Sequence, residues 1–260
     1  MRTETRLYID EDLAELAEGR ELGLDHAQSH YLRSVLRLRR GAALAVFNAR
    51  DGEWLARIEA LGKGWCSLAV GERLRAPAPE PDIWLVFAPI KRARIDFLAE
   101  KAAELGATVL QPVITRHTAV ARVNLERLAA NAREGAELCG RLAVPEVRAP
   151  LGFAELLAGW PRERRLLVCA EAGEARPIGE VLGEAAARES ERPEPWALMT
   201  GPEGGYAESE LDALRQLPFV SLVGLGPRLL RADTAALAGL AIWQALLGDV
   251  AGRPAWRAQD

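Results

Sequence analysis

The amino-acid sequence predicts an α/β protein in two parts, a small N-terminal β-barrel and a larger C-terminal domain with a mostly parallel sheet. Proline at every second position from Pro77 to Pro81 favours extended backbone and cannot continue a helix, so it marks a boundary. Short strand-like runs precede this boundary, and alternating strand-like and helical runs follow it. We therefore expect a barrel domain over 1–75, a linker over 76–81, a second domain over 82–250 and a tail over 251–260.

Short apolar runs separated by turn residues predict the barrel. Residues 48–52 and 62–64 contain Asn, Asp or Gly and are typical of turns between strands. Apolar residues at helical spacing predict one helix over about residues 27–38. The predicted strands of this domain are 44–47, 54–58 and 65–70.

In the second domain, strand-like segments alternate with helical segments. Such alternation predicts a mostly parallel sheet with helices on both faces, and ligands bind such sheets beyond the carboxyl ends of the strands. The predicted strands are 83–88, 108–114, 165–170, 196–200 and 220–225. The predicted helices include 95–105, 125–139 and 234–247.

Composition excludes several classes of protein. Apolar residues make up 49% of the 260-residue chain and charged residues 27%, as in folded globular proteins. The longest apolar run, Thr234–Leu247, is too short to span a membrane, and the N-terminus lacks the apolar stretch of a secretory signal. Three cysteines at wide spacings, without a C-x-x-C pair, predict reduced thiols and no metal site. We expect a cytoplasmic protein with no membrane attachment.

A basic segment lies inside this acidic chain. The net charge of −4 argues against a general nucleic-acid coat, yet no acidic residue occurs between Asp25 and Asp51. On the predicted helix, Arg33, Arg37 and Arg40 would share one face and suit an RNA backbone. A solvated helix face is the alternative interpretation.

Two glycine- and proline-containing loops are the strongest chemical signals. Residues 200–205 read Thr-Gly-Pro-Glu-Gly-Gly after an apolar strand, and glycines there let a ligand approach the backbone closely. The loop lacks the Lys-Ser or Lys-Thr of a Walker motif and the spacing of a dinucleotide motif. Taken alone, it fits an ordinary strand-to-helix turn equally well.

The second loop, residues 225–234, also follows an apolar strand and precedes a long apolar helix. We expect the two loops to end adjacent strands. The second loop gathers two cations, a carboxylate and a hydroxyl, from Arg228, Arg231, Asp233 and Thr234. A helix cap and a surface ion pair are the alternatives for these side chains.

Motifs in both domains together carry a family resemblance. They are Gly201–Gly205 with Glu210, Leu225–Ala235, His30–Gly41, Lys101–Gly106 with Arg116, and Glu137–Arg141. In this combination the chain resembles the SPOUT superfamily of trefoil-knotted methyltransferases, and specifically the family that methylates N3 of a uridine in 16S ribosomal RNA. Two positions depart from the family pattern: Asp233 replaces a glutamate and Leu138 replaces a glutamine.

The resemblance implies a deep knot in the C-terminal domain, a PUA-like RNA-binding barrel, a homodimer and S-adenosylmethionine as cofactor. Arg231 is the first candidate to stabilise an anion on the uracil, with Asp233 or Glu203 accepting its proton or orienting the arginine. The residues implied to line the cofactor are Thr200, Gly201, Glu203, Gly204, Leu225, Gly226, Leu230 and Thr234.

The implied substrate is the 16S RNA of the small ribosomal subunit. The residues expected to contact it are His30, Arg33, Arg37, Arg39, Arg40, Lys91, Arg94, Arg116 and Arg228. His117 is expected to be structural rather than a general base. Trp54, Trp65 and Trp84 could stack on bases, but their strand setting favours core packing. Two other functions stay open: a non-catalytic RNA-binding protein of ribosome assembly, and a nucleotide-dependent enzyme that uses Gly201–Gly205 as a phosphate loop.

Overall fold

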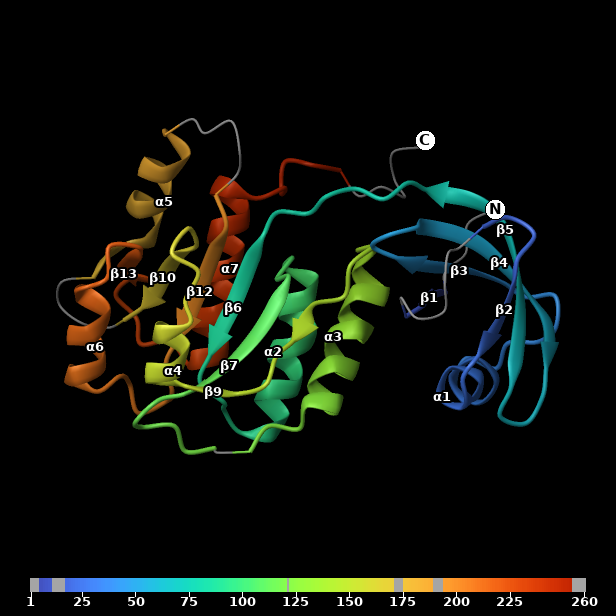
Figure 1. Cartoon of the computed structure of the whole chain (residues 1–260), viewed down its shortest axis with the longest axis horizontal. Coiled ribbons are helices and arrows are strands. Elements are labelled where there is room, and N and C mark those ends of the chain that lie inside the picture. Colours follow the sequence, from blue (N-terminus) through green and yellow to red (C-terminus); the bar gives the residue numbers. More distant parts are fainter. Residues whose placement is uncertain (1–4, 11–16, 121, 171–174, 189–193, 254–260) are drawn as a thin grey trace. The chain divides into compact units, whose positions relative to one another are not determined.

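The computed structural model describes residues 5–10, 17–120, 122–170, 175–188 and 194–253. The chain forms two compact units (Figure 1). The first comprises residues 1–79 with 142–144, and the second comprises residues 80–141 with 145–260. Each unit has its own apolar core. Among the described residues, no helix is long and apolar enough to cross a membrane.

The first unit contains a five-stranded sheet in the order β1-β3-β4-β5-β2. β1 runs parallel to β3, and the other neighbours are antiparallel. All three strands predicted for this unit are confirmed; β1 and β2 were missed because their three and four residues are too short to show a periodicity. The bounds are β1 Arg6–Tyr8, β2 Glu21–Leu24, β3 Ala43–Asn48, β4 Gly52–Leu61 and β5 Cys66–Arg75.

The helix of this unit is shorter than the sequence predicted. α1 (His26–His30) is capped by the Asp25 side chain and continues as one π-helical turn, Tyr31–Val35. Arg37 then adopts a left-handed conformation with φ of 55°, which ends the helical path. The prediction that Arg33, Arg37 and Arg40 share a helix face is therefore wrong, because the last two follow the helix.

The second unit contains an eight-stranded sheet in the order β11-β13-β10-β12-β6-β7-β8, with β9 paired to β7. Every pair in it is parallel, which confirms the predicted sheet type. The main strands are β6 Ile83–Phe87, β7 Val109–Ile114, β10 Arg165–Cys169, β12 Trp196–Thr200 and β13 Val220–Gly224. The two-residue strands are β8 Glu146–Val147, β9 Leu151–Gly152 and β11 Arg176–Pro177.

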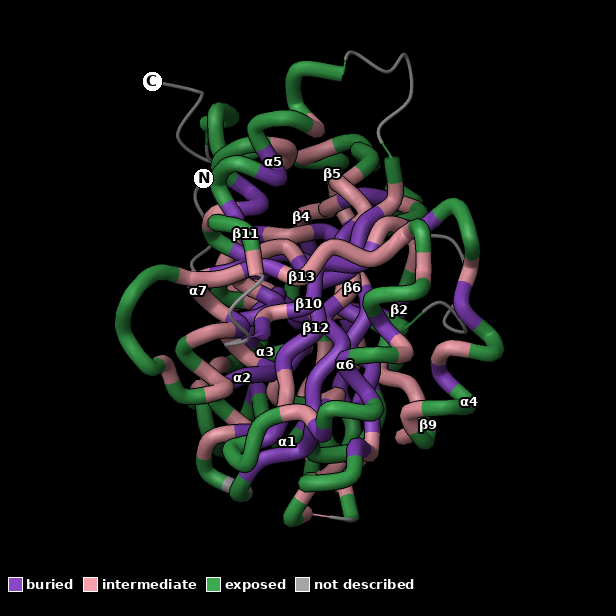
Figure 2. The backbone as a smooth tube through the Cα atoms, turned by 90° about the vertical axis from the view of Figure 1, so that its left-hand side faces the viewer, coloured by how far each residue is buried: buried purple, intermediate pink, exposed green. Residues whose placement is uncertain are grey.

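Helices cover both faces of this sheet, as the alternation of segments predicted. One apolar core contains residues of α2, α3, α5 and α7, and a second contains residues of α4 and α6. The central strands between them are buried almost throughout (Figure 2). The helices are α2 Arg92–Glu104, α3 Leu125–Cys139, α4 Phe153–Ala158, α5 Ile178–Ala186, α6 Glu208–Arg215 and α7 Ala232–Leu247.

The expected adjacency of the two loop-bearing strands is wrong. β12 and β13 both pair with β10, which lies between them. The sequence-based expectation failed because the order along the chain does not give the order of strands in a parallel sheet. Parallel strands are joined by crossover connections, so consecutive strands need not be neighbours. The carboxyl end of β10, at Cys169, therefore lies between the starts of the two loops.

A glycine sets the packing distance between α2 and α3. A Cβ at Gly135 would overlap the backbone carbonyl of Glu100, and backbone cannot yield as a flexible side chain does. Gly135→Ala is therefore expected to lower the free energy of unfolding by about 1–3 kcal/mol, although alanine is the better helix former. Urea denaturation measures the change. Gly183→Ala on α5 is the matched control, because a Cβ there meets nothing within 4 Å; it should gain about 0.5–1 kcal/mol. Equal stability of the two variants would contradict close packing.

Candidate functional site

The first glycine loop continues directly from the buried end of β12. The carbonyl of Thr200 accepts a hydrogen bond from Ala88 N–H at 3.0 Å, so the strand end is fixed to the segment after β6. A Cβ at Gly201 would lie 2.9 Å from the Tyr206 ring, and Gly205 has a φ of +71°. The loop therefore needs glycine at both positions: at Gly201 because the Tyr206 ring packs too closely for a Cβ, and at Gly205 because of its positive φ. Glu203 and Gly204 between them are exposed.

The second loop also depends on glycine. Gly226 follows β13 with a φ of +102°, a conformation that other residues rarely adopt. Leu225 packs against the core, whereas Leu229 is 81% exposed. Arg228 is also exposed, and Arg231, likewise exposed, occupies the N-cap of α7. The loop thus presents two arginines to solvent beside the N-terminus of a long helix.

An ion pair links this helix to α2. Arg94 Nη1 lies 3.4 Å from Asp233 Oδ1, and the two side chains are 31% and 16% exposed. The sequence grouped Arg94 with the RNA contacts and Asp233 with Arg231. The structure instead brings Arg94 and Asp233 together from helices that are 139 positions apart in the chain. A partly exposed pair of this kind contributes about 0–1 kcal/mol to stability, so its main effect is to fix the position of the carboxylate.

A third segment, after β7, packs against the first glycine loop; the sequence indicated its Arg116 and His117 but not this contact. Thr115 N–H donates to Thr118 Oγ1 at 2.9 Å and closes a short turn. His117 Nδ1 lies 3.2 Å from the Gly205 carbonyl, and a Cβ at Gly204 would lie 3.2 Å from His117 Cβ. The imidazole therefore packs against the first glycine loop, in agreement with the expected structural role of His117.

Glu210 joins the same two loops through backbone hydrogen bonds. Its side chain is 7% exposed, and its two oxygens accept hydrogen bonds from Arg116 N–H and Ala207 N–H, each at 2.9 Å. One buried carboxylate thereby connects the loop after β7 to the start of α6. In the sequence this residue was marked only by its position in the family motif, and a partner 94 positions away gave no local signal.

Tyr206 follows the first glycine loop and was not singled out from the sequence. Its ring packs against Gly201, and its hydroxyl is buried without a hydrogen-bond partner in the part of the chain that the structure describes. Burial raises the pKa of Tyr206 well above its ordinary value, with smaller contributions from Cys169 and Glu210. Burial also raises the pKa of the Cys169 thiol to about 12. Both groups therefore carry their protons at neutral pH.

The expected RNA contacts divide between the two units. His30, Arg33, Arg37, Arg39 and Arg40 are exposed in the first unit, and Arg40 lies 4.0 Å from Glu59. In the second unit, Lys91, Arg116 and Arg228 are exposed. The structure also shows that Arg94 is partly covered by its pair with Asp233.

The three tryptophans differ in exposure. Trp54 is partly buried against the core of the first unit, and Trp84 is partly buried with the Arg164 guanidinium 3.8 Å from its ring centroid. Trp65, in contrast, is 53% exposed. The expectation that Trp65 packs in a core is wrong, because this residue belongs to the β4–β5 turn rather than to a strand.

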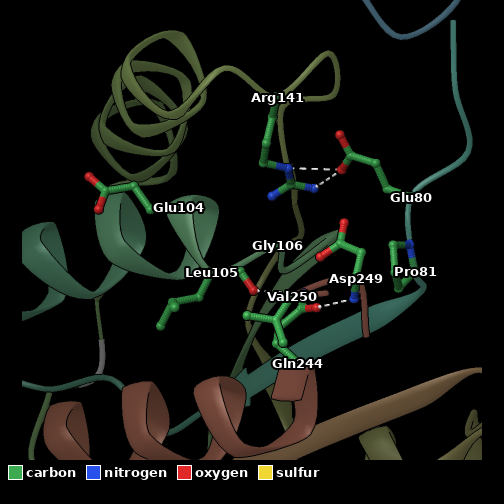
Figure 3. A pocket seen from close by; sticks show the side chains of 9 residues that line it. All are labelled: Glu80, Pro81, Glu104, Leu105, Gly106, Arg141, Gln244, Asp249 and Val250. Carbon is green, nitrogen blue, oxygen red and sulfur yellow. Dashed lines mark hydrogen bonds and ion pairs between the residues drawn. The ribbon is translucent and has the colours of Figure 1, made fainter. Parts of the chain in front are cut away.

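A hollow of about 180 Å³ lies elsewhere, near the start of β6 and the C-terminal ends of α2 and α7 (Figure 3). Arg141 on its wall binds Glu80 and donates to the carbonyls of Ala103 and Ala107. Gln244 donates to Leu105 O at 3.0 Å. These polar groups join segments of the fold.

Leu138, three positions before Arg141, is 68% exposed, so its departure from the family pattern removes no buried contact.

Replacing Glu210 tests the connection between the loops. Glu210→Gln keeps the shape of the side chain but turns an amide NH₂ toward one of the two backbone N–H groups. We expect a loss of about 1–3 kcal/mol in the free energy of unfolding, and faster amide exchange at Arg116 or Ala207. Glu208→Gln in the same helical turn is the control, because Glu208 is exposed and pairs with Arg215. Equal exchange rates in wild type and Glu210→Gln would contradict the proposed connection.

Comparison with known proteins identifies relatives along most of the chain. A family model for an RNA methyltransferase domain matches residues 77–244, and one for an RNA methyltransferase PUA domain matches residues 24–69. The ribosomal RNA small subunit methyltransferase E of Rickettsia conorii is 32% identical over 236 residues, covering 91% of this chain and 93% of the relative. The protein of the same name from Synechocystis is 35% identical over 231 residues, covering 86% and 73%.

A solved structure agrees with these matches. The crystal structure of a ribosomal RNA small subunit methyltransferase E from Neisseria gonorrhoeae, bound to S-adenosyl methionine, superposes with a TM-score of 0.81 at 28% identity. The match covers 95% of this chain and 99% of that one. The matches cover both units, and the chain belongs to the RNA methyltransferase family that includes the small-subunit ribosomal RNA methyltransferases E.

Proposed function

We propose that this protein transfers a methyl group from S-adenosylmethionine to N3 of a uridine in 16S ribosomal RNA. The observation that carries the proposal is the pair of glycine-dependent loops at the carboxyl ends of β12 and β13, on either side of β10. Ligands of open parallel sheets bind at such ends. The name of the relatives and the cofactor in the Neisseria structure supply the substrate class and the methyl donor.

The residues present fit this cofactor. A Cβ at Gly226 would meet nothing within 4 Å, so the backbone N–H and C=O groups there can approach a nucleoside. The corresponding space at Gly201 is occupied by the Tyr206 ring. When bound, S-adenosylmethionine supplies a methyl group on a positively charged sulfur. The residues proposed to hold it are Thr200, Gly201, Glu203, Gly204, Leu225, Gly226, Leu230 and Thr234.

The chain must handle one proton and one negative charge on the substrate. Uracil N3 carries a proton that has to leave before or during transfer, and the charge that develops spreads onto O2 and O4. Arg231 is proposed to stabilise that charge; its exposure at the N-terminus of α7, where the helix dipole adds positive potential, supports this role. Asp233, held by Arg94, and the exposed Glu203 are the proposed proton acceptors.

Exposed basic residues of both units are proposed to bind the RNA. His30, Arg33, Arg37, Arg39 and Arg40 in the PUA-like unit offer charge to phosphates, and Trp65 adds an exposed aromatic face on which an unpaired base can stack. In the second unit, the exposed Lys91, Arg116 and Arg228 offer further positive charge to phosphates. Contacts from these exposed guanidinium groups to phosphates would position the RNA but would not recognise its sequence. We also propose that the protein is knotted and homodimeric and that it acts in the cytoplasm on the small ribosomal subunit.

Titration with S-adenosylmethionine tests the cofactor assignment. Wild type should bind, and Gly204→Trp should not, because even a Cβ at this position comes within 3.2 Å of His117. Isothermal calorimetry measures both. Gly179→Trp on α5 is the control, since a Cβ there meets nothing within 4 Å, and it should bind as wild type does. A folded wild-type protein that fails to bind would exclude the enzyme and favour a non-catalytic RNA-binding protein.

The catalytic assignment of Arg231 has a separate test. Arg231→Ala should lower kcat by about 100-fold and leave the affinity for S-adenosylmethionine unchanged. Transfer of labelled methyl to small ribosomal subunits gives kcat, and mass spectrometry of the digested RNA identifies the modified nucleoside. Arg188→Ala, at an exposed position just after α5, should retain full activity. Arg231→Ala with wild-type kcat would remove this residue from the mechanism.

A further inference from the structure

His117 lies against the first glycine loop, although the two belong to distant parts of the chain. Its Nδ1 atom is 3.2 Å from the carbonyl oxygen of Gly205, which is 88 positions away in the sequence. A carbonyl oxygen can only accept a hydrogen bond, so Nδ1 carries the hydrogen and donates it. The side chain of His117 is exposed and belongs to no apolar core. The contact therefore acts on the loop and not on the packing of the sheet.

The segment that carries His117 is itself held in place on both sides of this residue. Thr115 N–H donates to Thr118 Oγ1 at 2.9 Å, and Thr118 N–H donates to the Thr115 carbonyl at 3.1 Å. Between them, Arg116 N–H donates to the buried carboxylate of Glu210 at 2.9 Å. These bonds fix the backbone directly before and after His117. The imidazole therefore needs little further ordering to reach its acceptor.

The accepting carbonyl belongs to the point at which the glycine loop turns. Gly205 N–H donates to the Pro202 carbonyl at 2.9 Å, which closes a turn over residues 202–205, and Gly205 has a φ of +71°. The preceding residue is also in contact, because a Cβ at Gly204 would lie 3.2 Å from His117 Cβ. Glycine has a wider choice of backbone conformations than other residues. A hydrogen bond to the Gly205 carbonyl from outside the loop selects one of them.

We propose that His117 is a positioning residue for the cofactor: its Nδ1–H group holds the Gly205 carbonyl and keeps residues 201–205 in the conformation that binds S-adenosylmethionine. This inference rests on the proposed function, which assigns Glu203 and Gly204 of this loop to the cofactor. A loop that is ordered before binding loses less conformational entropy on binding. The hydrogen bond therefore raises the affinity without touching the ligand, and His117 takes no part in the methyl transfer.

Two substitutions separate the hydrogen bond from the rest of the side chain. His117→Ala removes the donor, and its affinity for S-adenosylmethionine in calorimetry should fall about 3- to 10-fold. His117→Asn places an amide N–H where Nδ1–H was, so its affinity should return to within about twofold of wild type. The kcat at saturating S-adenosylmethionine should be unchanged in both variants. Amide exchange at Gly205 in the ligand-free protein should be faster in His117→Ala and normal in His117→Asn.

His26→Ala, which replaces an exposed histidine of the first unit, is the matched control and should bind as wild type does. Wild-type affinity in His117→Ala would overturn the inference, and so would an equal loss in both His117 variants, because the donor would then not be the cause. A lower kcat in both variants would overturn it in favour of a catalytic histidine. Failure of wild type to bind S-adenosylmethionine would reject the proposed function itself. Unchanged exchange at Gly205 in His117→Ala would reject the effect on the loop, so the two failures are distinguishable.

Discussion

All strand pairs of the larger sheet are parallel, and the proposed chemistry depends on this constraint. Parallel strands bring their carboxyl ends to one edge, so segments distant in the sequence meet there. The loops after β7, β12 and β13 all start at this edge, and β10 separates the last two. Glu210 then fixes the first of these loops to the second through two backbone hydrogen bonds. The loops after β7 and β12 are thus connected rather than independent of each other.

The alternation of strands and helices was predictable because a buried parallel strand and an amphipathic helix leave different periods in the sequence. The bounds of β12 and α3 agree with the predicted 196–200 and 125–139. The two-residue strands β8, β9 and β11 were not predictable, since so short a segment has no period. The helix end at Val35 was missed because it depends on the conformation of a single residue, Arg37.

The glycines of the candidate site were readable from the sequence, whereas its side-chain contacts were not. Gly201 and Gly226 stand in motifs that follow apolar strands, and the structure gives each a steric or conformational reason to be glycine. The contacts of Asp233 with Arg94, and of Glu210 with Arg116, join residues 139 and 94 positions apart. Such pairs are set by the order of strands and helices in space. A single sequence read locally contains no information about that order.

The protonation of Cys169 bears on the compatibility of this edge with a methyl donor. A thiolate is a strong nucleophile, and one placed beside an activated methyl group would itself be methylated. Burial raises the pKa of Cys169 to about 12, so the thiol at the end of β10 is neutral and unreactive near pH 7. The exposed groups proposed to act on the substrate, Arg231 and Glu203, lie instead on the solvent side of the loops. Burial therefore keeps the neutral thiol apart from the exposed groups that are proposed to act on the RNA.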